Sequence, residues 1–202
     1  MSTQTGSREG NLLFPIFLKI DQLQLLIVGG GNVGLEKLEA LLKNNPDAKV
    51  TLVGTTIKPE IVAVAEKHSG IKLVNRSFEP QDLEGVDVLL LATDSRETHI
   101  QIRALAKERG ILTNVADTPD LCDFYLGSTV KKGDLKIGIS TNGKSPTFAK
   151  RFRELLEEAV PEDVDQLLHN LQQLRNTLKG DFQEKVRVLN EHTASLVEKT
   201  NS

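Results

Sequence analysis

This 202-residue chain has one cysteine, no long hydrophobic run and no large excess of either charge. The single cysteine, Cys122, cannot form an internal disulfide, which excludes a disulfide scaffold and fits a reducing cytoplasm. The longest apolar runs, Leu25–Val28 and Val88–Ala92, are far shorter than the about 20 residues of a membrane-spanning helix. The first ten residues are polar, lack the hydrophobic region of a signal peptide and are expected to form a loose tail. We therefore expect a cytoplasmic protein that does not bind membranes.

Residue patterns for metal binding, hydrolysis and nucleic-acid binding are also missing. The histidines form no HxxH or HxxxH pair, so no metal site is predicted and each is expected at the surface: His68, His99, His169 and His192. No GxSxG sequence supports a hydrolase. The net charge of −3 argues against general nucleic-acid binding. One stretch, Ser128–Arg153, nevertheless carries seven bases and one acid, which favours attraction of a small polyanion.

The first part of the chain alternates between two kinds of pattern. Short β-rich or apolar runs predict strands, and longer amphipathic runs between them predict helices. Such alternation is typical of βαβ units with a parallel sheet in a doubly wound α/β fold. The expected strands are Gln24–Val28, Lys49–Val53, Ile71–Asn75, Val86–Ala92 and Ile111–Val115, and the expected helices are Asn32–Lys43, Ile57–His68 and Ser95–Arg109, with Ser95 as N-cap.

The pattern changes after Val115. Two strand-like runs, Ser128–Lys131 and Leu135–Ser140, predict a β-hairpin, and a helix is expected to begin at Ser145–Pro146. Two more helices are expected at Val164–Leu178 and Asp181–Glu198, with Gly180 between them. A leucine stripe on the first of these indicates helical packing within the chain or across a dimer: Leu167, Leu168, Leu171, Leu174 and Leu178.

The segment Gly29–Gly34 fits the GxGxxG pattern between an expected strand and an expected helix. In that context the glycines allow backbone N–H groups to approach a pyrophosphate at the helix N-terminus. A glycine-rich turn that binds nothing is the alternative, and we rank it below dinucleotide binding. The second strand ends without the usual acid, so Thr55 and Thr56 could bind a ribose but do not distinguish NAD from NADP. The candidate cofactor-binding residues from this pattern are Gly29, Gly31, Gly34, Thr55 and Thr56, and the family resemblance described below adds Asn32, Val33, Thr93 and Asp94.

Polar residues also follow the fourth and fifth expected strands, at the edge where such a cofactor binds. Asp117 is the best-placed proton acceptor there, although Asp-x-Pro also favours an Asx turn before Pro119, which local sequence makes somewhat the better interpretation. For Asp94 we favour capping of the next helix over a role in chemistry.

A third polar loop, Ser140–Pro146, lies within the basic stretch between a strand and a helix. A capped turn with solvated lysines would explain it, but the local excess of bases favours binding of carboxylates. The candidate substrate-binding residues are Asn114, Ser140, Thr141, Asn142, Lys144 and Ser145.

Five motifs in order give a more specific indication: Phe14–Leu18, Val28–Lys37, Ala92–Asp94, Asn114–Pro119 and Ile139–Pro146. Together they resemble the precorrin-2 dehydrogenase/sirohydrochlorin ferrochelatase family, the N-terminal module of siroheme synthases. Two departures are Gly34, where the family usually has alanine, and Gly127, where a proline is common. Neither departure touches the expected chemistry.

The resemblance implies an NAD-dependent oxidoreductase that converts precorrin-2 to sirohydrochlorin, with Asp117 as the catalytic carboxylate in place of the Asx turn. It also implies a homodimer, and in many members insertion of Fe²⁺ as a second substrate. The implied regions are an NAD-binding domain at 1–115, a central dimerisation hairpin at 116–144 and a helical part at 145–202. The alternative is an NAD-sensing regulatory domain without catalysis.

Overall fold

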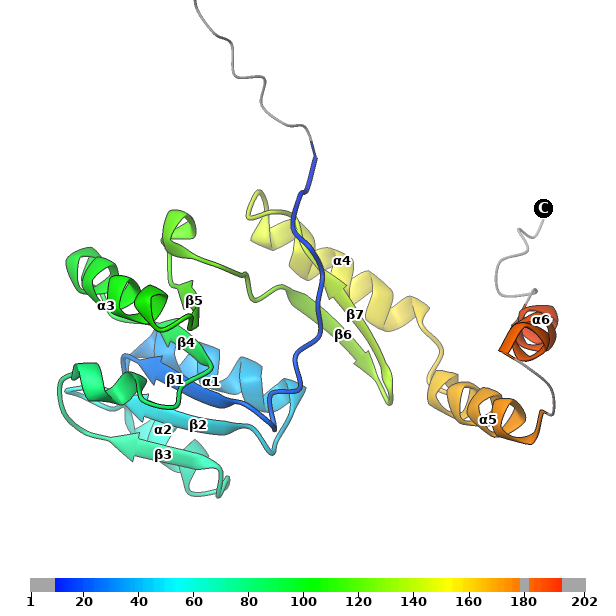
Figure 1. The fold of residues 1–202 in the computed structure, drawn as a ribbon, viewed down its shortest axis with the longest axis horizontal. Coiled ribbons are helices and arrows are strands. Elements are labelled where there is room, and N and C mark those ends of the chain that lie inside the picture. Colours follow the sequence, from blue (N-terminus) through cyan, green and yellow to red (C-terminus); the bar gives the residue numbers. More distant parts are fainter. Residues whose placement is uncertain (1–9, 179–181, 194–202) are drawn as a thin grey trace, which may run out of the picture. The chain divides into compact units, whose positions relative to one another are not determined.

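The computed structural model describes residues 10–178 and 182–193 (Figure 1). The chain divides into two compact units, Phe14–Leu126 and the combination of residues 1–13 with 127–202. The expected tail therefore lies almost wholly outside the described residues, as do Gly180 and the end of the last expected helix. No helix in the described ranges is long and apolar enough to cross a membrane.

The first unit is built on a parallel sheet of five strands in the order β3-β2-β1-β4-β5. The order reverses between β1 and β4, which makes this the switch point of a doubly wound fold. In the register of the sheet, Val28 of β1 lies beside Val53 of β2 and Leu91 of β4. The strands are β1 (Gln24–Val28), β2 (Lys49–Val53), β3 (Ile71–Val74), β4 (Val88–Leu91) and β5 (Leu112–Val115), which confirms the predicted α/β class.

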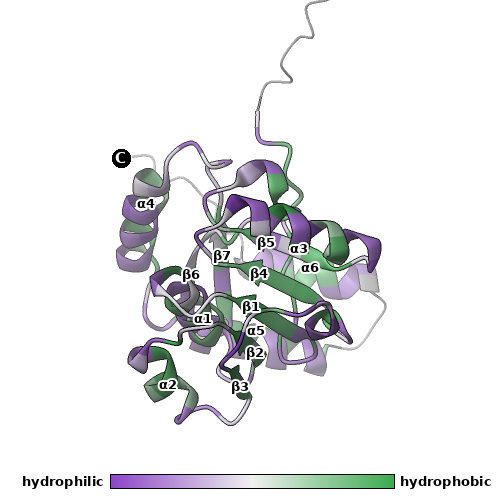
Figure 2. Cartoon of the chain, turned by 90° about the vertical axis from the view of Figure 1, so that its left-hand side faces the viewer, coloured by the Kyte–Doolittle hydropathy of each residue, from purple (hydrophilic) through white to green (hydrophobic). Residues whose placement is uncertain are grey.

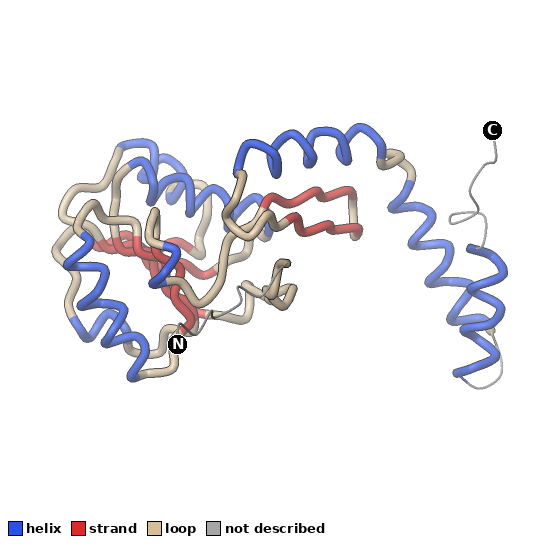
Figure 3. The backbone as a smooth tube through the Cα atoms, turned by 90° about the horizontal axis from the view of Figure 1, so that it is seen from above, coloured by secondary structure: helices blue, strands red, loops and turns tan. Residues whose placement is uncertain are grey.

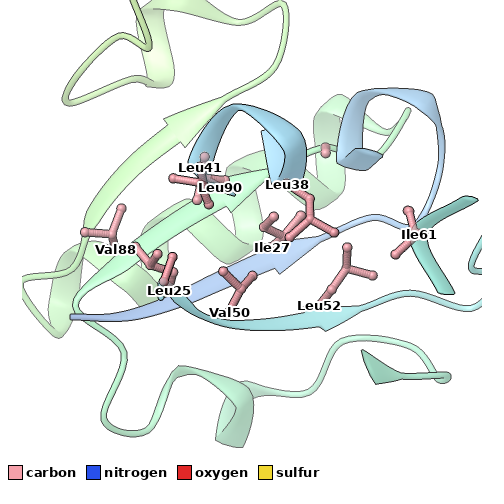
Figure 4. Close-up of a cluster of buried hydrophobic side chains, with 11 residues drawn as sticks. Leu25, Ile27, Leu38, Leu41, Val50, Leu52, Ile61, Val88 and Leu90 are labelled. Carbon is pink, nitrogen blue, oxygen red and sulfur yellow. The ribbon is translucent and has the colours of Figure 1, made fainter. Parts of the chain in front are cut away.

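Alternating side chains of the central strands supply two separate cores. Leu25 and Ile27 face Leu38 of helix α1 (Asn32–Asn44), as the cluster in Figure 4 shows. Leu26 packs in the second cluster with Ile102 of helix α3 (Arg96–Glu108). Because β1 and β4 are buried on both faces, they are hydrophobic along their length (Figure 2).

Helices α1 and α3 of the first unit begin where their sequences predict. The Ser95 hydroxyl caps α3 by accepting from the backbone N–H of Thr98 at 3.2 Å. Helix α2 (Pro59–Ala65) is shorter than the predicted helix, because it begins with proline at its first position and ends before the turn that leads to β3. Single 3-10 turns, η1 (Pro80–Leu83) and η2 (Pro119–Leu121), complete the unit.

The second unit contains the predicted hairpin, β6 (Ser128–Lys132) and β7 (Leu135–Ile139), which lies beside helix α4 (Pro146–Ala159) (Figure 3). Val130, Ile139 and Ala149 form the buried cluster between them. Helices α5 (Val164–Thr177) and α6 (Phe182–Thr193) follow. The hairpin turn is joined to the start of α5, because the Asp165 carboxylate accepts from the backbone N–H of Asp134 at 2.7 Å. Leu168 and Leu171 of the leucine stripe line a groove with Leu189 of α6, whereas Leu167 is exposed.

Candidate dinucleotide site and its carboxylate

Three glycines bring the loop after β1 against the neighbouring strands. Gly29 has a φ of +122°, and a Cβ there would collide with the carbonyl group of Ala92. A Cβ on Gly30 would meet the backbone of Thr56, and one on Gly34 would meet the carbonyl oxygen of Gly29. The glycines therefore allow a close approach of the β1 loop, the β2 loop, the β4 loop and the first turn of α1.

Gly31 differs from these glycines because a Cβ on it would meet nothing within 4 Å. It is also the N-cap of α1, so the helix begins without a side-chain cap, and its first turn contains no acidic residue. The first backbone N–H groups of a helix need external acceptors, and their aligned dipoles favour an anion. The open start of α1 therefore fits the pyrophosphate of a dinucleotide, and Gly31, Asn32 and Val33 are the residues that would hold it.

The loop after β2, which carries Thr55 and Thr56, lies against the glycine loop. Both threonines are exposed, and the side-chain amide of Asn75, when turned to donate, reaches the backbone carbonyl oxygens of Gly54 and Thr55 at 3.1 Å. Lys58 donates to the Asn32 side chain at 2.8 Å, which ties the loop after β2 to the start of α1. This side of the site offers hydroxyl groups and a lysine rather than the acid that binds a ribose in many dinucleotide folds.

The loop after β4 corrects two expectations. Ser95 caps α3 alone, so Asp94 is not the predicted cap and its side chain is exposed. His99 is not at the surface but 4% exposed, because it shares the sheet-facing side of α3 with Ile102. Its two ring nitrogens and the Thr93 hydroxyl are buried without a hydrogen-bond partner in the described structure. Burial lowers the pKa of His99, and the nearby backbone carbonyl of Thr93 acts against this without completing a hydrogen bond.

Asp117 lies just beyond β5 at the same edge of the sheet. Its φ is +50°, in the left-handed region that aspartate tolerates better than most residues. The side chain is exposed, and within the described ranges no group donates a hydrogen bond to its carboxylate, so the Asx turn weighed from the sequence does not form. The turn is held instead by Thr118, whose hydroxyl donates to the backbone carbonyl of Ala116 at 2.9 Å. The carboxylate is therefore free to contact a substrate.

A charged contact that the sequence analysis did not anticipate links α1 to β5. The ammonium group of Lys37 donates to Oδ1 of Asn114 at 2.7 Å. Burial lowers the pKa of Lys37, and the Cys122 thiol and the Glu36 and Asp117 carboxylates oppose this. The sequence held one indication of this contact. Lys37 is a cation that lies between the apolar residues Leu35 and Leu38, so its side chain begins close to the buried side of the helix.

Asn114, predicted to bind substrate, is 6% exposed and already committed to protein partners. Besides accepting from Lys37, its amide nitrogen donates to the backbone carbonyl of Phe124 at 2.9 Å and contacts the Cys122 sulfur at 3.7 Å. Cys122 in turn accepts from the backbone N–H of Val115 at 3.2 Å. These contacts tie β5 to α1 and to the segment that follows η2, and a contact of Asn114 with substrate stays a prediction.

The candidate substrate loop belongs to the second unit and is a capped turn. Ser145 caps α4 by accepting from the backbone N–H of Phe148 at 3.1 Å, and the Thr141 hydroxyl bonds to both backbone groups of Ser145 at 3.3 Å. Ser140 accepts from the backbone N–H of Asn142 at 3.2 Å, and Asn142 has a φ of +53°. Lys144 is exposed. The hydroxyl groups of this loop are therefore occupied, whereas its cation faces solvent.

Comparison with known families places these features in context. A family model for NAD(P)-binding domains matches residues 16–128. The chain belongs to this NAD(P)-binding family. A second model, for the central region of sirohaem biosynthesis proteins, matches residues 132–159. The family membership confirms the predicted NAD(P)-type cofactor, for which the open start of α1 is suited.

Curated relatives of the chain are also named for sirohaem biosynthesis. The chain is 35% identical over 173 residues to the siroheme synthase of Methylococcus capsulatus, covering 86% of this chain and 34% of the relative. It is 34% identical over 180 residues to the siroheme synthase of Pseudoalteromonas translucida, covering 89% and 36%. The chain thus spans about a third of the length of these relatives. The solved structure of SirC, a precorrin-2 dehydrogenase, shares the fold with a TM-score of 0.66, 23% identity and coverage of 93% and 90%. The resemblance to the siroheme synthase module is confirmed.

Proposed function

We propose that this chain is an NAD-dependent dehydrogenase that oxidises precorrin-2 to sirohydrochlorin. The observation that carries the proposal is the unpaired carboxylate of Asp117 at the same sheet edge as the open start of α1. That arrangement offers a proton acceptor beside a dinucleotide site, as a dehydrogenation requires. The similarity to siroheme synthases supports the tetrapyrrole as the substrate class.

The oxidation removes one hydride and one proton from the substrate. Bound NAD supplies the hydride acceptor. Asp117 accepts the proton at its carboxylate, which no other described group occupies. Gly31, Asn32 and Val33 bind the pyrophosphate through their backbone N–H groups, while Thr55 and Thr56 bind the adenosine ribose. Thr93 and Asp94 extend the cofactor-binding set on the side of β4.

Lys144 is the candidate for attracting a polycarboxylate, because its side chain in the loop before α4 is exposed. The exposed bases Lys150 and Arg151 of α4 belong to the same basic stretch. We propose that Lys144 attracts the substrate carboxylates, with Ser140, Thr141, Asn142 and Ser145 shaping the loop that presents it. Asn114 contributes by orienting the segment that carries Asp117.

Two finer properties belong to the same proposal. We propose a homodimer, supported by exposed apolar side chains on residues 12–17, among them Phe14 at 86% exposure, and on α4 at Phe148 and Leu155. We also propose that Fe²⁺ is a second substrate, with Asp117 accepting protons from the macrocycle as the metal enters. A cytoplasmic location and NAD rather than NADP stay predictions from the sequence and the resemblance.

A regulatory domain that only senses NAD is the competing hypothesis. It would need the open start of α1 but not the unpaired carboxylate of Asp117. The curated relatives reported above are named as synthases, which favours catalysis.

The test is an anaerobic incubation of the protein with precorrin-2 and NAD, followed by spectroscopy and then by addition of Fe²⁺. We expect NADH to form together with a sirohydrochlorin spectrum, and a siroheme band to grow faster than in a metal-only control. Intact NAD binding without any tetrapyrrole-dependent NADH formation would reject the dehydrogenase and favour the sensing hypothesis.

A further inference from the structure

Lys37 occupies an unusual position for a lysine. Its neighbour Leu38 is fully buried against the sheet, and Lys37 itself is half-buried on the flank of α1 that faces β5. The ammonium donates to Asn114 at 2.7 Å, and it finds no second acceptor within the described ranges. An ammonium group has three donors, and the described chain supplies an acceptor for one of them. The charge is therefore anchored by one hydrogen bond and stays available to act on a group bound beside it.

The surroundings fix this charge in place. Asn114 cannot turn away, because its amide nitrogen donates to the backbone carbonyl of Phe124 at 2.9 Å. The ionisable groups that act on Lys37 are the Cys122 thiol and the carboxylates of Glu36 and Asp117, and Lys37 in turn acts on His99 across the sheet edge. Lys37 is thus a cation held in place within electrostatic reach of the carboxylate that the proposed reaction uses.

The topology places this charge on one side of the cofactor site. In a doubly wound sheet a dinucleotide lies across the switch point, with one half on each side of the first strand. The β2 side carries Lys58, Thr55 and Thr56, whereas the β4 and β5 side carries Asp117. The half that reacts belongs beside the proton acceptor, and Lys37 lies on that side through its contact with β5.

We propose that Lys37 makes the site prefer the reduced dinucleotide over the oxidised one. The oxidised nicotinamide ring carries a positive charge, which disappears when the ring gains a hydride. A fixed cation on that side repels the oxidised ring and not the reduced ring, so it favours the direction of hydride transfer in the proposed dehydrogenase, on which this inference rests. At an effective dielectric constant of about 20, a unit charge about 12 Å away changes relative affinity by about tenfold.

The experiment compares the dissociation constants of NAD⁺ and NADH, measured without tetrapyrrole at fixed pH and salt. The ratio of NADH affinity to NAD⁺ affinity should be higher in the wild-type protein than in variants without the charge of Lys37. Lys37→Gln can still donate to Asn114 but carries no charge, and Lys37→Met removes both the charge and the hydrogen bond. Both variants should reduce the preference for NADH about tenfold, whereas Lys37→Arg should keep it.

Lys58→Met is the matched control, because Lys58 contacts Asn32 on the opposite side of the site. It should weaken both dinucleotides alike and leave their ratio unchanged. An unchanged ratio in Lys37→Gln, or an equal change in Lys58→Met, would overturn the proposal. Because no tetrapyrrole is present, a protein that fails to oxidise precorrin-2 but shows the ratio change would refute the proposed substrate and not the role of Lys37.

Discussion

Two helices of this protein, α1 and α4, each begin after a strand and a short loop, but only α4 has a side-chain N-cap. At α4 the Ser145 hydroxyl accepts from the backbone N–H of Phe148, so the helix supplies its own cap. At α1 the cap position is Gly31, which has no side chain to offer, and the space beside it is open. A helix that caps itself has satisfied one of its free donors, whereas an uncapped helix keeps its donors for a ligand.

Buried polar atoms without a hydrogen-bond partner also distinguish the unit that carries α1 from the loop before α4. The unpartnered ones among the described residues belong to Thr93, His99 and Arg103, all in the unit that carries α1. The Thr141 hydroxyl in the loop before α4 is bonded to Ser145 instead. The unit with the dinucleotide site therefore holds unused hydrogen-bonding capacity, and the loop before α4 is already satisfied internally.

The largest effect is expected at the carboxylate beside the open helix. Asp117→Asn keeps the size of the side chain but cannot accept a proton, so NADH formation from precorrin-2 should fall about 100- to 10,000-fold. NADH affinity, measured by fluorescence titration, should change little because the proposed cofactor contacts remain. A variant with full turnover would show that Asp117 has no catalytic role.

Closing the open N-terminus should sharpen the contrast between the helices. Gly31→Ala adds a methyl group where nothing lies within 4 Å, and the φ of −86° suits alanine. Thermal stability should fall only slightly, because alanine is a poorer N-cap than glycine, whereas the methyl group should hinder a phosphate and weaken NADH binding about tenfold or more. Calorimetric titration together with a melting curve tests this. Wild-type affinity in the variant would contradict binding of the dinucleotide at the start of α1.

The reciprocal change belongs to α4. Ser145→Ala removes a helix cap and should lower the free energy of unfolding by about 1 kcal/mol. Denaturant unfolding measures this loss, and NADH affinity measured on the same sample should equal that of wild type. A large loss of NADH affinity in Ser145→Ala would mean that α4 rather than α1 binds the dinucleotide.

The smallest effect concerns the buried imidazole of His99. Because burial lowers its pKa, the unfolded chain binds a proton at a higher pH than the folded protein does. The free energy of unfolding should therefore fall as pH drops below about 6.5, until the folded protein is protonated as well. His99→Leu should remove this dependence, so the two unfolding curves should separate below pH 6.5. Parallel curves would contradict the assignment.

Local pattern predicted most of the fold. The five strands of the sheet follow from apolar runs, and the caps at Ser95 and Ser145 follow from residue type. The glycine loop was also predictable from the GxGxxG pattern, and the structure shows why Gly29 is needed there, because its φ is +122° and a Cβ would collide with Ala92. These features depend on neighbours in the chain, which the sequence displays directly.

The contacts of the site were less accessible from sequence. Lys37 and Asn114 are 77 residues apart, so their hydrogen bond depends on the sheet order that places β5 near α1. The burial of His99 depends on which side of α3 faces the sheet, although its spacing to Ile102 indicated that side. The role of Asn114 in substrate binding stays a prediction, whereas its hydrogen bonds could not be predicted, because two of its partners lie in the segment that returns after η2.

The most direct test of the contrast between the two helix starts is an amide NMR titration with NADH. The backbone N–H signals of Gly31, Asn32 and Val33 should shift strongly, because these groups would donate to the pyrophosphate. The signals of the first turn of α4, at Thr147 and Phe148, should stay in place because that turn is capped by Ser145. Shifts confined to α4, with the α1 signals unchanged, would contradict the account.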